Sequence, residues 1–307
     1  MTASLFPLLL ALAAAPLLSG IINRVKAYYA GRAGRPLLQL YFDIFKLLRK
    51  GEVISPTTSW IFSAGPPIYL ASMICALLVV PFGTARPPLS FAGDFIVMAY
   101  LMGIGRFALI LAALDTGSAF EGMGASREAA FSALAEPLIF LCFLSLDSGI
   151  LPSLHDFFHE AGKEIWTFAR PELLLIPVVF FVLLLVENCR MPVDDPNTHL
   201  ELTMIHEVII LDHSGPNLAF ILYASSLKLW LFALLLVNML IPELPGGIPS
   251  GMALASAGIF GTAALVGIAE SCTARLRLLA VPRMLGMAGM AAALALVVVL
   301  FRHLHAR

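Results

Sequence analysis

Eight apolar stretches, each about as long as a membrane-spanning helix, constrain this chain more than any other feature of its sequence. They cover residues 2–22, 60–82, 94–114, 127–147, 171–188, 217–241, 251–271 and 282–302. A helix crosses the hydrocarbon core of a bilayer with about 20 mostly apolar residues and satisfies its own backbone polar groups. The composition agrees, because 60% of the residues are hydrophobic and 13% are charged, against about 25% charged residues in soluble domains. We therefore predict an all-α polytopic membrane protein with about eight transmembrane helices, in which residues 1–307 form a single integral membrane domain.

The distribution of Lys and Arg among the connecting loops predicts the orientation of the chain, because cytoplasmic loops carry an excess of these residues. With the N-terminus outside, twelve Lys and Arg lie in inner loops or at adjoining helix ends, and five lie outside. The predicted cytoplasmic loops are about 23–59, 115–126, 189–216 and 272–281, and both termini are predicted to lie outside. The first stretch lacks the basic segment that opens a cleaved signal peptide, so we interpret it as a retained span.

The segment LLQLYFDIFKLLRK, residues 37–50, predicts an amphipathic helix rather than a further span. Its apolar residues recur at helical spacing, whereas polar residues such as Asp43 and Lys46 fall on the opposite face. A basic amphipathic helix of this kind is suited to lie in the membrane interface. The alternative is a cytoplasmic helix that packs against a partner.

Two cations, Arg106 and Lys228, lie near the middle of predicted spans, where a charge costs about 2.5–3.5 kcal/mol. Such charges persist beside a partner or water, so they either belong to a proton path or hold helices together, since snorkelling is strained at this depth. Glu136 lies roughly 13 Å inside the fourth predicted span and is a candidate proton carrier. Further candidate partners are acids at or near the span ends: Asp115, Asp147, Glu187 and Glu270.

The loop VENCRMPVDDPNTHLELTMIHEVIILDHSG, residues 186–215, holds six of the twenty acids and three of the seven histidines. Asp195 followed by Pro, or the competing Thr198-x-x-Glu201 capping box, predicts a short helix that ends before Ser214. A solvated loop is the simplest interpretation of this segment. Its part LELTMIHEVIIL is too apolar for free solvent, however, and favours packing on the bundle or on a docked subunit.

The histidines and cysteines do not predict a metal site. His199, His206 and His213 are spaced by seven residues, which puts them on one helical stripe about 10 Å apart, whereas a metal binds His nitrogens at about 2 Å. His206-Glu207 also lacks the later His of the metalloprotease motif. No C-x-x-C pair occurs among the four scattered cysteines, so any redox metal is expected in another chain. These cysteines are Cys75, Cys142, Cys189 and Cys272.

Four long segments carry a family resemblance. They are GRAGRPLLQLYFDIFKLLRKGEVISP (31–56), GRFALILAALDTGSAFEGMGASREA (105–129), the loop 186–215 and AESCTARLRLLAVPRML (269–285). Together they resemble the family of the quinone-chamber membrane subunit of respiratory complex I, which includes the membrane subunits of energy-converting (group 4) [NiFe] hydrogenases of the formate hydrogenlyase and hydrogenase-4 type. The LDTGS and GASREA motifs and Lys228 in SSLKLW are similar to the hydrogenase branch. Two departures are Gly105, where we would expect Ala, and DDPNTHLEL, where complex I members carry an acidic run that only Glu201 matches.

The resemblance implies a non-catalytic membrane subunit in the inner membrane of a prokaryote. Such a subunit anchors a cytoplasmic [NiFe]-hydrogenase and iron–sulfur module and takes part in coupling electron transfer to proton (or sodium) translocation. The implied partners are hydrogenase large and small subunits, a ferredoxin-like iron–sulfur subunit, antiporter-like membrane subunits and the lipid bilayer. The [NiFe] and [4Fe-4S] centres are expected in those partners and no cofactor in this chain, and the net charge of −1 does not suggest nucleic acid.

Site residues follow from the resemblance together with the charges described above. The candidates for the proton path and coupling are Arg106, Glu136, Asp147, Glu187, Asp194, Glu201, Glu207, Lys228 and Glu270. The candidates for partner docking are Arg32, Arg35, Asp43, Lys46, Arg127, Arg190, Arg275 and Arg277. Three alternatives stay open at this point: the quinone-chamber subunit of a complex I-type NADH/quinone oxidoreductase, a secondary transporter, and a passive anchor. The transporter is weakened by the absence of paired repeats and of matching short spans broken by Gly or Pro.

Overall fold

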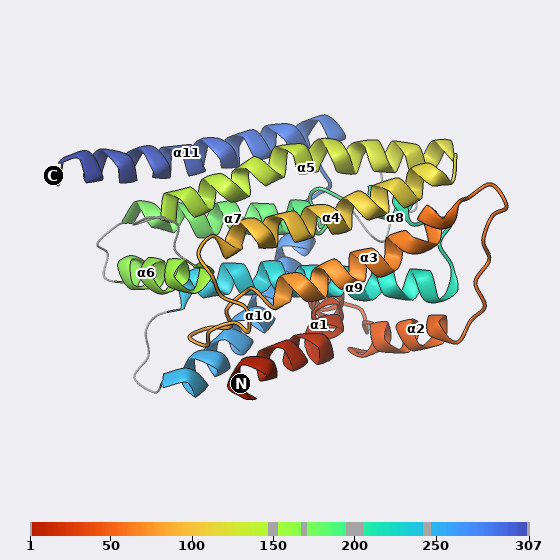
Figure 1. Cartoon of the computed structure of the whole chain (residues 1–307), viewed down its shortest axis with the longest axis horizontal. Coiled ribbons are helices and arrows are strands. Elements are labelled where there is room, and N and C mark those ends of the chain that lie inside the picture. Colours follow the sequence, from red (N-terminus) through yellow and green to blue (C-terminus); the bar gives the residue numbers. More distant parts are fainter. Residues whose placement is uncertain (1, 147–152, 167–170, 195–204, 242–246, 306–307) are drawn as a thin grey trace.

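The computed structural model describes residues 2–146, 153–166, 171–194, 205–241 and 247–305, and these residues form helices and no strand. Seven of the helices described are long and apolar enough to cross a membrane. They are α1 (Thr2–Tyr29), α3 (Trp60–Leu77), α4 (Asp94–Asp115), α5 (Ala119–Leu146), α9 (Gly215–Leu240), α10 (Gly247–Cys272) and α11 (Val281–His305). An eighth apolar helix, α7 (Leu175–Glu187), is shorter and follows a 3₁₀ turn, η1 (Pro171–Leu174). The prediction of an all-α polytopic membrane protein is confirmed (Figure 1).

Several helix bounds differ from those predicted. The fourth predicted span, 127–147, belongs to a helix that begins at Ala119, so Arg127 and Glu128 lie well inside α5 rather than at its end. The apolar-window prediction missed this first part of α5 because EGMGASRE is polar, although it remains helical. A helix that was not predicted, α6 (Leu154–Trp166), buries Phe157 and Phe158.

The helix α9 occupies the centre of the bundle. Of its most apolar stretch of 18 residues, 78% is buried inside the protein, whereas 28% of the corresponding stretch of α11 is buried. Helix α9 contacts five other helices on different sides, namely α1, α2 (Gln39–Leu48), α3, α7 and α10. A helix that is hydrophobic on all sides is expected in such a central position. The one cation of α9, Lys228, is therefore held inside the protein and away from lipid.

Contacts join the four predicted cytoplasmic loops to one another, and the end of the bundle to the right in Figure 1 carries α2, α8 (His206–Ile209) and the start of α9. Hydrogen bonds and ion pairs join Val53 to Ser214, Ser59 to Asp115, Glu121 to Asp212 and Asp194 to Arg275. Because each bond links two different loops or helix ends, the loops form one connected cap. We call this region the inner end.

The predicted amphipathic helix is α2, and it packs beside α9 and α1 without burying any residue. The Tyr41 hydroxyl donates a hydrogen bond to the carbonyl of Ala13 in α1, which ties one face of α2 to the bundle. Phe42 and Phe45 lie on the exposed surface, at 60% and 56% exposure. These apolar side chains suit the interfacial location predicted from the sequence.

Candidate functional site

Arg106 lies inside the bundle and contacts three carboxylates from two other helices. Its guanidinium nitrogens lie 2.6 Å from Glu136 Oε1 of α5, 2.5 Å from Glu187 Oε2 of α7 and 3.7 Å from Glu128 Oε1 of α5. The Arg106 side chain is 7% exposed and that of Glu187 is 2% exposed. The close approach of α4 to α3 at this level uses Gly105, where a Cβ would meet Ser72 and Tyr69. The glycine that departs from the family pattern therefore sits at a tight helix crossing.

Lys228 extends this network to the central helix. Its Nζ lies 2.9 Å from Glu187 Oε2, so Glu187 receives both buried cations. Glu187 is the last residue of α7, and the chain then turns at Cys189, whose φ of 47° lies in the left-handed region. We call Arg106, Glu128, Glu136, Glu187 and Lys228 the central ion cluster. It holds two cations and three carboxylates.

Glu128 was missed by the sequence prediction. The predicted span 127–147 leaves it next to the end of the helix, whereas α5 begins earlier and carries it inward to face Arg106. The signal that could have found it is its spacing of eight residues from Glu136, which puts the Cα atoms of the two residues about 12 Å apart along one helix. Both then lie within reach of a single long guanidinium.

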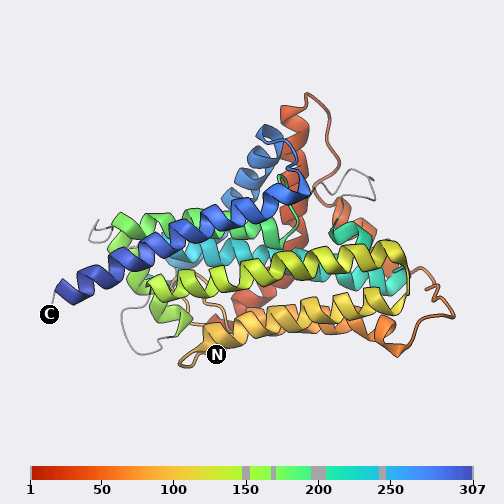
Figure 2. The ribbon, with the colours of Figure 1, turned by 90° about the horizontal axis from the view of Figure 1, so that it is seen from above.

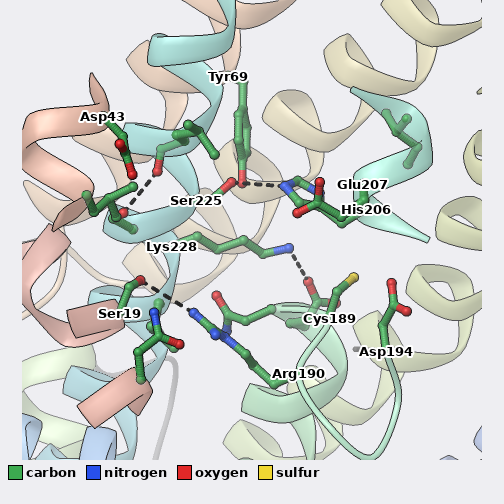
Figure 3. Close-up of a pocket in the computed structure, with 18 of the residues that line it drawn as sticks. Ser19, Asp43, Tyr69, Cys189, Arg190, Asp194, His206, Glu207, Ser225 and Lys228 are labelled. Atoms are coloured by element: carbon green, nitrogen blue, oxygen red, sulfur yellow. Dashed lines mark hydrogen bonds and ion pairs between the residues drawn. The ribbon is translucent and has the colours of Figure 1, made fainter. Parts of the chain in front are cut away.

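A cavity of about 260 Å³, lined by both charged and apolar side chains, leads from the central ion cluster toward α2. Figure 3 shows the Lys228 side chain reaching across it between Tyr69 and Cys189. His206 of α8 lies in the wall, where its Nε2 is 3.2 Å from Ser225 Oγ of α9, and Glu207 also lines the cavity. Because Asp43 of α2 closes its other side, the cavity brings inner-end residues and mid-span charges around one space.

Three further ion pairs lie at the inner end. Glu270 of α10 lies 2.8 Å from Lys26 Nζ of α1 and 3.6 Å from an Arg190 nitrogen. Asp194 lies 2.7 Å from an Arg275 nitrogen and also accepts a hydrogen bond from the Ile205 backbone amide. The loops that begin after α7 and after α10 are therefore fastened to the bundle by charge.

The predicted docking residues lie in different surroundings. Arg190 and Arg275 form ion pairs inside the chain, and Asp43 and Arg35 line the cavity. The exposed members of the set are Arg32, Arg35, Lys46 and Arg277, while Arg127 is partly buried in α5. Their role in docking stays a prediction.

Asp115 is not a partner of the buried cations, and that expectation was wrong. Its carboxylate instead accepts hydrogen bonds from the Ser59 amide at 2.7 Å, from the Ser59 hydroxyl and from the Phe62 amide. These groups stand at the start of α3, where the free N–H groups of a helix attract an anion. Asp147 and Glu201, two other predicted site residues, lie outside the residues that the structure describes.

The expected histidine stripe is also corrected. Within the described part of the loop the helix α8 covers only His206–Ile209, so His206 and His213 do not share a helical face. The candidate caps Asp195, Thr198 and Glu201, and His199, lie outside the described residues. His, Cys, Asp and Glu form no group of three that could hold a metal ion in the parts of the chain described.

His213 and Cys189 are buried at the inner end in their neutral forms. The His213 ring stacks on Phe62 with 4.1 Å between centroids, and burial lowers the pKa of His213 to about 4. Burial, together with the nearby Glu128 carboxylate, raises the pKa of the Cys189 thiol well above its ordinary value. Neither group therefore adds a charge at the inner end at neutral pH.

Comparison with known proteins identifies relatives over nearly the whole chain. Residues 2–301 match the family described as NADH dehydrogenase. Formate hydrogenlyase subunit 4 of Escherichia coli K12 is 30% identical over 290 residues, covering 91% of this chain and 93% of the relative. Hydrogenase-4 component C of the same organism is 30% identical over 228 residues, covering 74% of this chain and 71% of the relative.

A solved structure has the same fold. A chain of the membrane-bound sulfane sulfur reductase, described as an archaeal respiratory membrane complex, superposes with a TM-score of 0.81 at 19% identity. The match covers 97% of this chain and 98% of the other. The helix arrangement of the bundle is thus shared with a chain of an archaeal membrane complex.

Proposed function

Since the chain belongs to the NADH dehydrogenase family of complex I-like membrane subunits, we propose that it is the membrane subunit of an energy-converting hydrogenase complex. In this role it anchors a cytoplasmic module and couples electron transfer there to proton movement. The single observation that carries the proposal is the central ion cluster, whose cations Arg106 and Lys228 lie well inside membrane-spanning helices and which a cavity of mixed polar and apolar walls joins to the inner end. Two relatives named as a formate hydrogenlyase subunit and a hydrogenase-4 component support the hydrogenase branch.

The anchoring role concerns the inner end, which we propose faces the cytoplasm. Its exposed cations, among them Arg32, Lys46 and Arg277, offer contacts to acidic surfaces of a docked module. Hydrogenase large and small subunits and a ferredoxin-like subunit would bind here and carry the [NiFe] and [4Fe-4S] centres. Antiporter-like subunits would adjoin the bundle within the membrane.

The coupling role depends on how the ion pairs are connected. Glu187 binds Arg106 and Lys228 at once, so adding a proton to Glu187 would release both cations toward other carboxylates. A change of charge on a docked module would act first on the inner-end pair Asp194–Arg275 and on Glu207. The effect reaches the cluster through the cavity wall, because interactions between buried charges are weakly screened by salt.

Replacing Lys228 tests the coupling role. We expect Lys228→Met to lower the number of protons moved per H₂ evolved in sealed vesicles, because Glu187 loses one of its two cations. The matched control is Lys50→Met, which makes the same chemical change at an exposed residue of the loop after α2. Glu136→Ala tests the other edge of the cluster. Unchanged proton-to-H₂ ratios in both cluster variants would remove these residues from the path and favour a passive anchor.

The quinone-chamber alternative uses the same cavity. Besides its charged residues, the cavity is lined by apolar side chains that include Leu40, Leu109, Leu222 and Leu229. A quinone head group would need such mixed walls. If quinone-site inhibitors slow electron transfer in the purified complex, the quinone chamber replaces the hydrogenase proposal; if they leave H₂ evolution unchanged, it is excluded.

A further inference from the structure

One member of the central ion cluster reaches the outer surface of the bundle. The Glu136 side chain is 46% exposed, although its carboxylate lies 2.6 Å from the buried Arg106. It lies in a shallow groove of about 40 Å³ between α4 and α5, whose walls include Tyr100, Gly103 and Phe140. The absence of a side chain at Gly103 leaves the carboxylate open to this flank, since a Cβ there would touch Glu136. Figure 2 shows α4 and α5 running side by side along this flank.

The exposed carboxylate lies at hydrocarbon depth. Glu136 is ten residues from the end of α5 at Leu146, which corresponds to about 15 Å along the helix. Its partner Arg106 is nine residues from the end of α4 at Asp115. An ionised carboxylate that faces lipid at this depth is costly, and such groups in membrane proteins face other protein or water. The groove is therefore expected to be covered by protein.

The charges of the cluster indicate what covers it. Arg106 and Lys228 are two cations against the three carboxylates Glu128, Glu136 and Glu187, and each of the described contacts of Glu136 with a cation is with Arg106. One negative charge is thus left over, and Glu136 is the carboxylate that presents it at the surface. A cation brought to the groove would balance it.

The surrounding flank has the form of a helix-packing surface. Exposed small residues of α5, Ala129, Ala130 and Ala133, lie on the stretch of α5 that leads to Glu136, and small residues let transmembrane helices approach closely. Along α4 the exposed apolar residues recur at alternating spacings of three and four. They are Val97, Tyr100, Ile104, Phe107, Leu111 and Leu114.

We propose that the α4–α5 flank binds a transmembrane helix of another membrane subunit, and that this helix places a Lys or Arg beside Glu136. The cation completes the charge balance of the central ion cluster from outside the chain. This inference rests on the proposed membership of a multisubunit complex. It adds a specific surface, a specific contact and the charge of the partner residue.

Photo-crosslinking in the intact complex tests the surface. A benzophenone amino acid replaces Tyr100 on the flank, and in a matched variant it replaces Met290 on α11; both residues are 68% exposed. We expect the Tyr100 variant to crosslink to a helix of another membrane subunit that has a Lys or Arg within two turns of the attachment point. Lipid adducts alone at Tyr100, in a complex that retains its other subunits, would overturn the inference, as would a crosslinked helix without a basic residue. A protein adduct at Met290 that maps to the same helix would overturn the assignment to this flank.

Charge exchange tests the contact. Glu136→Lys is expected to release the neighbouring subunit during purification, and replacing the crosslinked basic residue by Glu is expected to restore it. Glu136→Gln, which keeps the shape of the side chain, should retain the subunit with lower occupancy and shows that the bundle still folds. Dicyclohexylcarbodiimide supplies an independent measurement, because it modifies protonated carboxyls that face lipid. Labelling of Glu136 in the intact complex would mean that the side chain faces lipid as a neutral acid, and the inference would fail.

The two proposals fail in different ways. Purification of this chain without any other subunit would contradict its proposed function. Purification of the full complex with only lipid at the Tyr100 position would contradict the docking surface alone.

Discussion

Two regions of the bundle are built from the same three helices, α4, α5 and α7, but hold opposite kinds of side chain. At the end that carries α6, Phe95 of α4, Phe143 of α5 and Phe180 of α7 pack together, with Phe143 5.5 Å from Phe95 and 5.6 Å from Phe180. Phe157 and Phe158 of α6 join them, and we call these five residues the aromatic cluster. Further along the same helices stand Arg106, Glu136 and Glu187 of the central ion cluster.

This contrast separates support from function. The aromatic cluster is held by close packing without charge, so it can fix the spacing of α4, α5 and α7. That fixed spacing places the carboxylates of two helices around the guanidinium of the third. The ion cluster and cavity gather several titratable groups around one space, whereas at the α6 end the buried Asp94 accepts a hydrogen bond from the Leu154 amide at 2.7 Å.

The largest effect is expected from removing the cation at the centre. Arg106→Met leaves Glu128, Glu136 and Glu187 facing one another with Lys228 as their one remaining cation in the cluster. Removing one partner of a buried ion pair destabilises a protein by about 3–5 kcal/mol. We expect the variant complex to lose that amount of unfolding free energy, measured by thermal and denaturant unfolding in detergent.

Arg106→Lys is the control for charge without geometry. Lysine keeps the positive charge but cannot reach three carboxylates with a planar fork, so its loss should be smaller than that of Arg106→Met. Equal stability of the wild type and Arg106→Met would show that the ion cluster does not hold the helices together.

A loss of similar size, but of a different kind, is expected from the aromatic cluster. Phe143 is fully buried, and Phe143→Ala removes contacts with Phe95 and Phe180, at a cost of about 3–5 kcal/mol. Because no charge changes, the ratio of protons moved to H₂ evolved should stay at the wild-type value. Phe143→Leu keeps most of the side-chain volume, so the unfolding free energy of this variant should lie between that of the wild type and that of Phe143→Ala. If Phe143→Ala changed the ratio of protons moved to H₂ evolved without changing stability, the aromatic cluster would have a functional role and would not serve as support alone.

Much of this arrangement was predictable from the sequence, since it follows from local signals. The apolar stretches predicted the membrane helices, and the two mid-span cations Arg106 and Lys228 predicted a buried polar site. Glu136 and Glu187 were predicted as carboxylates of that site, and the structure brings both to Arg106. A charge inside an apolar helix needs a partner. The sequence shows such a charge directly, but it does not show which residue is the partner.

The remaining features depend on tertiary placement. Glu128 belongs to the cluster because α5 begins before its apolar stretch. Asp115 does not belong to it, because α3 begins beside Asp115 and its amides bind the carboxylate. The cavity could not be predicted either, because its walls come from α1, α2, α8 and α9 as well as the loop after α7. Distances between such segments are not encoded in their spacing along the chain.

The inner end also contains a buried histidine, His213, which stacks on Phe62. Its protonation makes the unfolding free energy of the protein depend on pH in the acid range. The folded pKa of His213 is about 4, below the value of about 6.5 expected for the unfolded chain. Between these values the unfolded state binds a proton that the folded state does not, so stability falls as pH drops through this window and is unaffected above it. At pH 5.5 the loss amounts to about 1.4 kcal/mol.

His213→Phe is expected to remove this pH dependence while keeping the stacking contact with Phe62. The measurement is the change in unfolding free energy between pH 7.5 and pH 5.5, compared between the variant and the wild type. Equal changes in the two proteins would mean that His213 is protonated in the folded state and that its pocket is not apolar.

The smallest effect concerns Asp115, which belongs to the inner end but not to the ion cluster. Its carboxylate accepts hydrogen bonds from Ser59 and from the Phe62 amide, and a lost helix cap of this kind costs about 1 kcal/mol. We expect Asp115→Ala to lower stability by that amount and Asp115→Asn, which keeps one acceptor oxygen, to lower it by less. The proton-to-H₂ ratio should be unchanged in both, because no buried cation loses a partner. A lower ratio in Asp115→Ala would show that the contact between the end of α4 and the start of α3 also takes part in coupling, and that the function is not confined to the ion cluster and the cavity.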